Sequence, residues 1–413
     1  MIRIAALALL VVAAGAPVAE AASPQTALRR DLAAAMRSAG PASGAYVAEA
    51  AEGRTFFADR SSTPRILASN TKLFVTATAL ARLGTEATLP TSVLAIDEPD
   101  GKGVLRGHLH LRGGGDPTFG SRGFARRAYG RATGIEDLAA RVSRAGIESV
   151  SGRVVGDESL FDRLRGTPAT GFRSAGDIGG PLTALSYNRG LANEFGSAFQ
   201  VNPAAFAAAR LTAALEARGV NVRGAPSAGP TPARATVLAT VQSPSMARLA
   251  QLTNKPSDNL LAELLAKRLS PRGSTGGSTA GGVAVMERFA RRLGSRARLT
   301  DGSGLDRGNQ ASPRAMVRLL RELRARDEFA AFRDSLPVAG RDGTLRDRMR
   351  RGAARGRCRA KTGTLRDVSA LSGYCQTRRG GTLVFSIIMN RTSPGGARNV
   401  QDRMANLMAA YRG

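Results

Sequence analysis

The chain has 413 residues with a formal net charge of +28, and 43% of its residues are hydrophobic. This length exceeds one simple core and indicates two or more domains, while the apolar content excludes a disordered protein. The charge would suit nucleic-acid binding, but aromatic residues make up only 5% and tryptophan is absent. Because stacking platforms are scarce and the arginines are scattered, we expect no nucleic-acid partner and interpret the charge as suited to an anionic cell wall.

The first residues have the pattern of a signal peptide. A positive start at 1–3 precedes a short apolar run at 4–14 and a small-x-small cleavage site at 19–21. The run is too short to span a membrane comfortably, and no later stretch is long and apolar enough. We therefore expect 1–21 to be removed and the mature protein to be exported to the periplasm or cell-wall space. Peripheral association with membrane or wall, and the oligomeric state, stay open.

Apolar patterns predict the elements of the chain up to residue 240. In chain order they are a helix at 25–39, strands at 45–50 and 55–58, a helix from Ser69 to about Gly84, strands at 107–111 and 152–157, helices at 135–145 and 204–218, a loop at 163–180 and a linker at 224–234. From about residue 86 the predicted strands are short and are separated by glycine turns. We therefore expect an inserted domain at 86–240.

The remaining chain predicts a helical region followed by strands. In order we expect helices at 245–252, from 260 onward, at 283–294 and at 312–326, strands at 360–365, 368–373 and 382–389, and a last helix at 397–411. The two ends of the chain would then supply one antiparallel sheet with helices on both faces. The fold class is accordingly α/β (α+β), with a discontinuous catalytic domain at 22–85 and 241–413.

Ser69 and Lys72 form the motif on which the functional interpretation depends. Residues three apart share a face of a helix, so the Ser69 hydroxyl would lie beside the Lys72 amine. A serine is a poor nucleophile at neutral pH unless an adjacent base activates it. By itself the motif also fits a helix cap next to a solvated lysine, because four-residue motifs recur freely.

Two further motifs follow in a fixed order, Ser257-Asp258-Asn259 and Lys361-Thr362-Gly363. An acyl-transfer site needs a nucleophile, a base, a proton route to the leaving group and an oxyanion hole. The trio supplies these groups, and it is typical of penicillin-binding proteins and serine β-lactamases. The three motifs together, each in a fitting context, favour a serine acyltransferase over chance.

We assign each motif a role in that chemistry. Ser69 is the expected nucleophile and Lys72 the base, whose pKa must fall, with repulsion from Lys361 as the expected help. Ser257 would relay a proton, and Asn259 would hold the substrate backbone. Lys361 would present a cation to an anionic group of the substrate, together with the hydroxyls of Thr362 and Thr364. Gly363 permits close approach of the backbone, and N–H groups of Ser69 and Thr364 would form the oxyanion hole.

The sequence resembles the class C low-molecular-mass penicillin-binding proteins, the D-alanyl-D-alanine carboxypeptidase/endopeptidase family. Beyond the trio, four blocks that resemble those of the family are 113–117, 254–260, 301–305 and 340–345. The resemblance implies a penicillin-binding/serine β-lactamase-like domain with an inserted α/β domain. It also implies hydrolysis of peptidoglycan stem peptides through an acyl-enzyme, inhibition by β-lactams and no cofactor or metal. The balance between carboxypeptidase and endopeptidase activity stays open.

Family members recognise a side chain of the stem peptide from the insertion, and Asp157 is our match for that residue. An aspartate in a turn or at the surface is the alternative for this position. The two cysteines, Cys358 and Cys375, are expected to form a disulfide in an exported protein, with two free thiols as the alternative.

Other enzyme classes fit less well. A class A β-lactamase needs a glutamate followed by asparagine four residues later, but the glutamates at 263, 287, 322 and 328 are followed by Lys267, Arg291, Arg326 and Phe332. A Ser-His-Asp hydrolase or a metal site would have to use His108 or His110, which lie on one predicted strand without a nearby cysteine or carboxylate. The glycines at 113–115 lack the helix and lysine of a phosphate site.

Two non-enzymatic alternatives remain. A non-catalytic peptidoglycan-binding protein of the same fold would not need a nucleophile beside a base, so the intact Ser69 and Lys72 argue against it. Polyanion binding through the net charge would show as a steep salt dependence.

Overall fold

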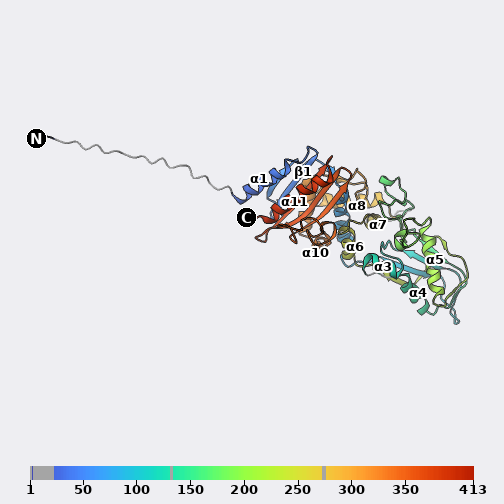
Figure 1. Cartoon of the computed structure of the whole chain (residues 1–413). Helices are drawn as coiled ribbons and strands as arrows, with labels where there is room; N and C mark the ends of the chain where they lie inside the picture. Colours follow the sequence, from blue (N-terminus) through green and yellow to red (C-terminus); the bar gives the residue numbers. More distant parts are fainter. Residues whose placement is uncertain (1, 3–22, 131–133, 272–275) are drawn as a thin grey trace.

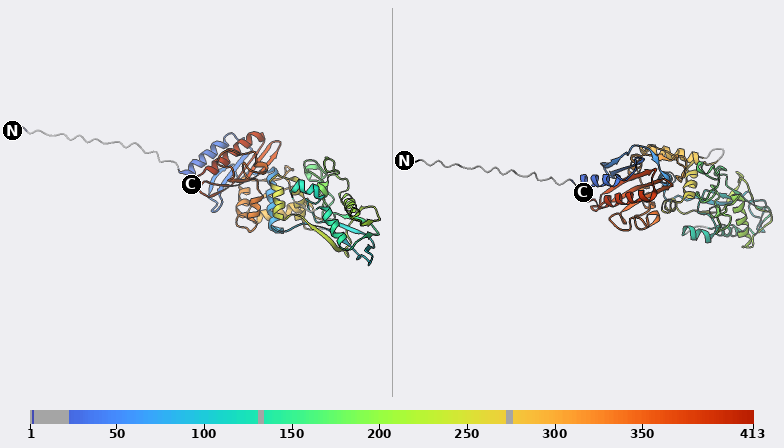
Figure 2. Two further views of the ribbon diagram at one scale, coloured as in Figure 1. Left: turned by 60° about the horizontal axis from the view of Figure 1, so that its bottom comes forward. Right: turned by 45° about the horizontal axis from the view of Figure 1, so that its top comes forward.

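The computed structural model describes residues 2, 23–130, 134–271 and 276–413. The predicted signal peptide lies outside this part of the chain, apart from residue 2. Two five-stranded sheets organise the described residues, one toward each end of an elongated molecule (Figures 1 and 2).

The first sheet joins the two ends of the chain, as the sequence predicts. Its strands, in spatial order, are β14 (Cys358–Leu365), β15 (Val368–Gln376), β16 (Thr382–Asn390), β1 (Ser43–Glu49) and β2 (Thr55–Asp59). All neighbours are antiparallel, and Ala45 of β1 lies opposite Ile387 of β16. In Figure 1 the blue β1 therefore lies among red strands.

Helices cover both faces of this sheet because alternate side chains of each strand point to opposite faces. Val47 packs with α1 (Pro24–Met36) and α11 (Pro394–Ala410) on one face. Its neighbour Ala48 belongs to the larger core on the other face. The helices of that second layer are α2 (Lys72–Leu83), α6 (Met246–Asn254), α7 (Asn259–Leu269), α8 (Thr279–Arg292), α9 (Pro313–Leu323) and α10 (Phe329–Ser335).

The helix α2 lies at the centre of that layer, and its residues from Lys72 to Leu80 are all buried. A helix that is apolar all round is a core helix, and α2 contacts α6, α7 and α8. A short 3-10 helix, η1 (Ala68–Thr71), precedes it, so Ser69 lies in the turn before the α-helix. The chain leaves α2 at Gly84, whose φ of 94° suits glycine.

The second sheet consists of residues between 90 and 242. Its strands, in spatial order, are β10 (Ser227–Ala228), β8 (Val154–Asp157), β6 (Leu109–Gly113), β4 (Pro90–Ala95) and β11 (Thr236–Gln242). Helices α3 (Arg122–Tyr129), α4 (Ile135–Arg144) and α5 (Pro203–Glu216) accompany it, with the short helices η2 (Pro168–Thr170) and η3 (Tyr187–Gly190). The predicted linker at 224–234 is wrong in part, because Ser227–Ala228 adds a parallel strand to β8.

Smaller elements complete the fold. Two three-stranded sheets have the orders β12 (Ala297–Arg298), β13 (Gln310–Ala311), β3 (Arg65–Ile66) and β5 (Val104–Leu105), β7 (Ser149–Val150), β9 (Asn221–Val222). A last 3-10 turn is η4 (Gly343–Leu345). The expected disulfide is present: Cys358 and Cys375 face each other across β14 and β15, with Cα atoms 4.1 Å apart.

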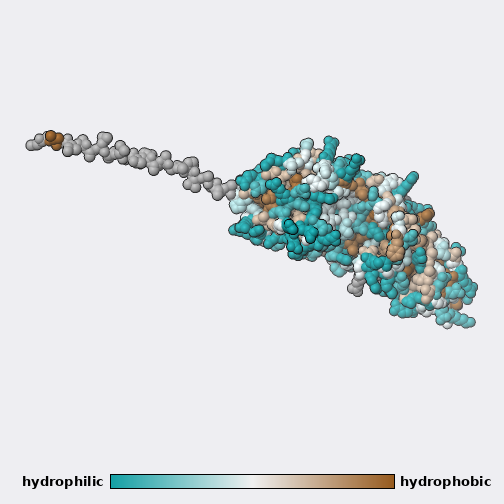
Figure 3. Space-filling view, viewed as in Figure 1, coloured by the Kyte–Doolittle hydropathy of each residue, from teal (hydrophilic) through white to brown (hydrophobic). Residues whose placement is uncertain are grey.

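The face shown in Figure 3 is largely hydrophilic, with hydrophobic residues scattered over it. Within the described ranges, every helix is too short or too polar to cross a bilayer.

Candidate active site

The structure brings Ser69 and Lys72 together as their spacing predicts. The Lys72 Nζ donates a hydrogen bond to Ser69 Oγ at 2.9 Å. Lys72 is fully buried at the start of α2, whereas Ser69 keeps partial exposure. A substrate could therefore reach the hydroxyl, while the amine behind it is screened from water.

Two further acceptors surround the Lys72 amine. Its Nζ lies 2.6 Å from Asn259 Oδ1 and 2.6 Å from the carbonyl oxygen of Ser303. Together with Ser69 Oγ these three acceptors match the three N–H donors of an ammonium group. The arrangement thus holds the protonated form, and Lys72 must lose a proton before it can act as a base.

Burial of the ammonium lowers the pKa of Lys72 to about 8. Desolvation is the largest cause, and nearby Asp301, Glu263 and Asp258 limit the fall because they favour the charged form. The sequence predicts a lowered pKa for Lys72, with repulsion from Lys361 as a contribution. In the structure burial dominates at Lys72, and the repulsion adds to the lowered pKa of Lys361.

Ser257 and Lys361 form the second half of the site. Lys361 Nζ donates to Ser257 Oγ at 2.8 Å and to the carbonyl oxygen of Thr362 at 2.9 Å. The Lys361 side chain is fully buried, and this burial, with Lys72 as the second cause, lowers its pKa well below the ordinary value. Ser257 has a φ of 65°, a left-handed conformation that a serine adopts at a cost of about 1–3 kcal/mol. Such strain is typical of residues held for function.

The loop at 254–259 places its residues through a helix cap. The Asp258 side chain accepts from the N–H of Leu261 and caps α7, and it also pairs with Arg189 at 2.7 Å. Asn259 therefore begins α7 and directs its amide toward Lys72, while its Nδ2 donates to the carbonyl of Asp177. Asn259 is thus a partner of the base in this structure, in addition to the substrate contact that we expect.

The strand β14 approaches the Ser69 turn closely. The Asn70 side chain donates to the carbonyl of Lys361 at 3.0 Å. A Cβ atom at Gly363 would lie 2.7 Å from the carbonyl oxygen of Leu67. This distance is too short for any larger residue, so glycine is required where the strand passes the turn.

The structure adds two buried acids near Lys72, Glu263 and Asp301, which the sequence did not identify as site residues. Glu263 is fully buried and accepts N–H bonds from Gly302 and Ser303 at 2.7–3.1 Å, which fixes the carbonyl that Lys72 contacts. Asp301 accepts from the N–H of Gly304 and from Asn309. Burial is the main cause that raises the pKa of Glu263, to about 8, and that of Asp301. The available signal was spacing, since residues four apart share a helix face and Glu263 follows Asn259 by four.

The threonines of β14 flank Gly363 and form hydrogen bonds with residues of other elements. Thr362 Oγ1 is 2.7 Å from Thr344 Oγ1, whose backbone N–H donates to the carbonyl of Lys255. Thr364 is exposed, and its Oγ1 accepts a hydrogen bond from Arg398 at 3.4 Å. The loop that carries Ser257 and the strand that carries Lys361 are therefore joined through Thr344.

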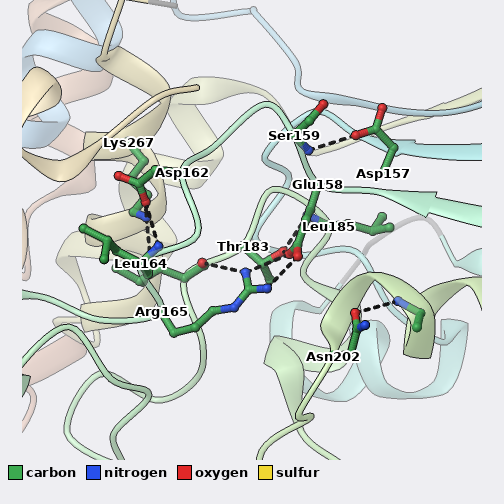
Figure 4. Close-up of polar contacts among 12 residues, drawn as sticks. Asp157, Glu158, Ser159, Asp162, Leu164, Arg165, Thr183, Leu185, Asn202 and Lys267 are labelled. Carbon is green, nitrogen blue, oxygen red and sulfur yellow. Dashed lines mark hydrogen bonds and ion pairs between the residues drawn. The ribbon is translucent and has the colours of Figure 1, made fainter. Parts of the chain in front are cut away.

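Asp157 lies at the end of β8 in the second sheet (Figure 4), whereas Ser69 and Lys72 lie in η1 and at the start of α2. Its carboxylate accepts from the N–H groups of Ser159 and Thr231 at 2.9 and 2.8 Å. Burial would raise the pKa of Asp157, but these hydrogen bonds outweigh it and lower the pKa. The residue borders a hollow of about 350 Å³ that Arg112 also lines. No hydrogen bond links Asp157 to the serines and lysines above among the described residues.

His110 lies on β6 of the second sheet, and His108 precedes that strand. His108 Nδ1 accepts from the N–H of Arg153, and His110 is buried with a pKa lowered mainly by that burial. Across the described ranges, no three residues of the His, Cys, Asp and Glu types gather in a metal-binding group.

The chain is similar to known proteins over most of its length. The family described as "D-Ala-D-Ala carboxypeptidase 3 (S13)" matches residues 28–172 and 191–411. A D-alanyl-D-alanine carboxypeptidase of Actinomadura sp. (strain R39) is 29% identical, over 94% of this chain and 85% of its own. A carboxypeptidase of Mycobacterium tuberculosis is 31% identical over the same shares. The crystal structure of penicillin binding protein 4 from Haemophilus influenzae has a similar fold, with a TM-score of 0.76 and 20% identity over 90% of this chain and 97% of that one.

Proposed function

The chain belongs to the D-Ala-D-Ala carboxypeptidase 3 (S13) family, and we propose that Ser69 carries out its reaction on peptidoglycan stem peptides. The observation that supports this proposal most is the contact between Ser69 Oγ and the buried amine of Lys72 at 2.9 Å. A base with a lowered pKa beside a hydroxyl is the usual arrangement of an activated nucleophile.

In the acylation step, neutral Lys72 takes the proton of the Ser69 hydroxyl. The Ser69 oxygen attacks the carbonyl carbon of the penultimate D-alanine, and the oxyanion is stabilised by the N–H groups of Ser69 and Thr364. The amide bond then breaks, and the leaving nitrogen receives, by way of Ser257, the proton that Lys72 took from Ser69. Terminal D-alanine departs with its amine, leaving an ester on Ser69. Water attacks this ester, so the shortened peptide leaves as an acid and Ser69 regains its proton.

Acylation is expected to accelerate as the pH rises toward 8. Only the neutral amine accepts the proton, and burial lowers the pKa of Lys72 to about 8. Below this value the neutral fraction, and with it the acylation rate constant, should rise about tenfold per pH unit. Intact-mass kinetics of β-lactam acylation between pH 5.5 and 9 would measure the profile. A rate constant that stays flat over this range would contradict Lys72 as the titrating base.

The function is tested by release of D-alanine from an acyl-D-Ala-D-Ala peptide, with Ser69→Ala as the blank. We expect turnover by the wild type alone, since the variant lacks the nucleophile. A β-lactam should in parallel add its mass once to the wild type and not to the variant. A folded wild type that neither releases D-alanine nor forms the adduct would favour the alternative, a non-catalytic peptidoglycan-binding protein.

The remaining assignments are proposals of the same kind. β-Lactams are proposed as covalent inhibitors, in line with the complex of the Haemophilus protein with a β-lactam. Export to the periplasm or wall space, and DD-endopeptidase activity beside the carboxypeptidase reaction, extend the proposal. We also retain 86–240 as an inserted domain, since β4 and β11 pair where the chain enters and leaves the second sheet. Asp157 would contact the stem-peptide side chain from that domain.

A further inference from the structure

Two ion pairs hold the segment that carries Ser257, one on each side of it in the sequence. Before it, Lys255 pairs with Asp342 at 2.5 Å. After it, Asp258 pairs with Arg189 at 2.7 Å, so this second pair reaches the segment from η3. The φ of Ser257 is 65°, and a residue keeps such a strained conformation only where its surroundings over-determine it. The two pairs supply that constraint.

The guanidinium of Arg189 contacts the Asp258 carboxylate at two points. Its Nη1 donates to Oδ2 at 2.7 Å, and its Nη2 donates to Oδ1 at 3.3 Å. The two side chains are only 20% and 17% exposed, so solvent screens the pair little. The same Oδ1 accepts the N–H of Leu261 and caps α7. The pair thus fixes the residue that separates Ser257 from Asn259.

The turn that carries Arg189 is itself held in an unusual conformation. Asn188 and Arg189 have φ values of 48° and 59°, in a left-handed region that few residues other than glycine adopt. The Asn188 side chain accepts the N–H of Ser121 at 2.8 Å. The Tyr129 hydroxyl lies 3.5 Å from Arg189 Nη1 and donates to the carbonyl of Pro117. Such local strain, fixed by specific contacts, is typical of residues held for function.

The same guanidinium lies against the segment that contacts Asn259. The Asn259 Nδ2 donates to the carbonyl oxygen of Asp177 at 2.6 Å, while its Oδ1 accepts from Lys72. Two residues after Asp177, a Cβ atom on Gly179 would lie 2.7 Å from Nη2 of Arg189. Arg189 therefore borders both contacts that reach the 257–259 motif from outside α7.

We propose that Arg189 is a positioning residue of the active site and acts through its pair with Asp258. The pair keeps Ser257 and Asn259 in the orientation that the reaction needs. The region at 86–240 thereby contributes to catalysis itself, in addition to the substrate contact proposed for it. This inference rests on the proposed function, since it concerns the same site.

The test measures kcat and KM for D-alanine release by Arg189→Met. We expect kcat to fall by about 10- to 100-fold, because a small misplacement of catalytic groups is enough for such a loss. KM should change less, because the groups of β14 stay in place. Arg189→Lys should recover part of kcat, since it keeps the charge but not the two-point contact. Arg127→Met is the matched control, because Arg127 of the same region pairs with Glu194 at 2.7 Å, and it should behave like the wild type.

A double-mutant cycle with Asp258→Asn tests the route through Asp258. Asparagine still caps a helix well, so this variant weakens the pair and keeps the cap of α7. If Arg189 acts through Asp258, the double variant should be no slower than the slower single variant. Asp258→Asn should itself lower kcat, so it carries the test should Arg189→Met not fold.

Three results would overturn the inference. One is wild-type kcat in folded Arg189→Met, or in folded Asp258→Asn if the first variant does not fold. Another is a lower melting temperature of Arg189→Met with unchanged kcat, which indicates a purely structural role. The third is a double variant whose loss is the product of the two single losses. Failure of the proposed function would look different, because the wild type itself would then release no more D-alanine than Ser69→Ala.

Discussion

Replacing Lys72 with methionine is expected to lower kcat/KM for D-alanine release by about 10³-fold, the usual loss when a general base is removed. Methionine has a similar length and carries no charge, so the variant fills the same buried space. Its thioether neither accepts the Ser69 proton effectively nor donates to Asn259 and Ser303. Ser69 would then keep its proton at neutral pH and attack slowly. Steady-state release of D-alanine measures the loss.

The control for this variant is Lys102→Met, which removes an exposed lysine from the inserted region and should retain wild-type activity. A thermal melt shows whether the variant is folded, since methionine leaves Asn259 Oδ1 and the carbonyl oxygen of Ser303 without the Lys72 donor. A folded Lys72→Met protein that keeps more than about a tenth of wild-type kcat/KM would contradict the assignment of Lys72 as the base.

The sequence correctly predicts the elements whose pattern of apolar and polar residues lies within one short stretch of the chain. The first sheet follows from alternating strands near both ends of the chain, and the structure pairs β1 with β16 as expected. The three motifs also meet in space, since β14 and α7 both contact the region of η1 and α2. Local pattern could predict these features because two of the motifs lie at the start of a helix and the third lies on the strand that precedes the apolar β15.

Strands of the second sheet were harder to predict. In β4 the residues from Thr91 to Ala95 are all buried, so the strand shows no alternation of apolar and polar side chains. The segment Ser227–Ala228 pairs for only two residues and lies among glycines and prolines, which is why it looked like a linker. Both strands depend on partners distant in sequence, and such pairing leaves little trace in a short window.

The electrostatics of the site could not be predicted from spacing either. The full burial of Lys361 depends on how β14 packs against η1, and the sequence alone presents this lysine as a free cation. Glu263 lies between leucines and alanines of α7, where only the fold shows that it faces the 302–303 backbone. Buried charges are determined by tertiary contacts, so the sequence predicts that the pKa of Lys72 is lowered but does not show that burial is the main cause.

Lys267 links α7 to the loop after β8 through an ion pair with the partly buried Asp162, shown in Figure 4. Its side chain is fully buried, and Nζ lies 2.5 Å from Asp162 Oδ1 and 2.8 Å from the carbonyl of Leu164. Removing one partner of such a pair leaves an uncompensated charge. We therefore expect Lys267→Met to lower the free energy of unfolding by about 3–5 kcal/mol, as measured by urea denaturation.

The double variant Lys267→Met/Asp162→Asn separates the ion pair from packing. Replacing Asp162 with asparagine removes the carboxylate charge that Lys267→Met leaves without a partner. The double variant should therefore recover most of the lost stability. A double variant as unstable as Lys267→Met would instead attribute the loss to the contact with Leu164 and to packing of α7. Because Asn259 begins the same helix, a loosened α7 should also show as weaker acylation of Ser69 in the single variant. Recovery of both properties together would establish that this pair supports the catalytic helix from the inserted region.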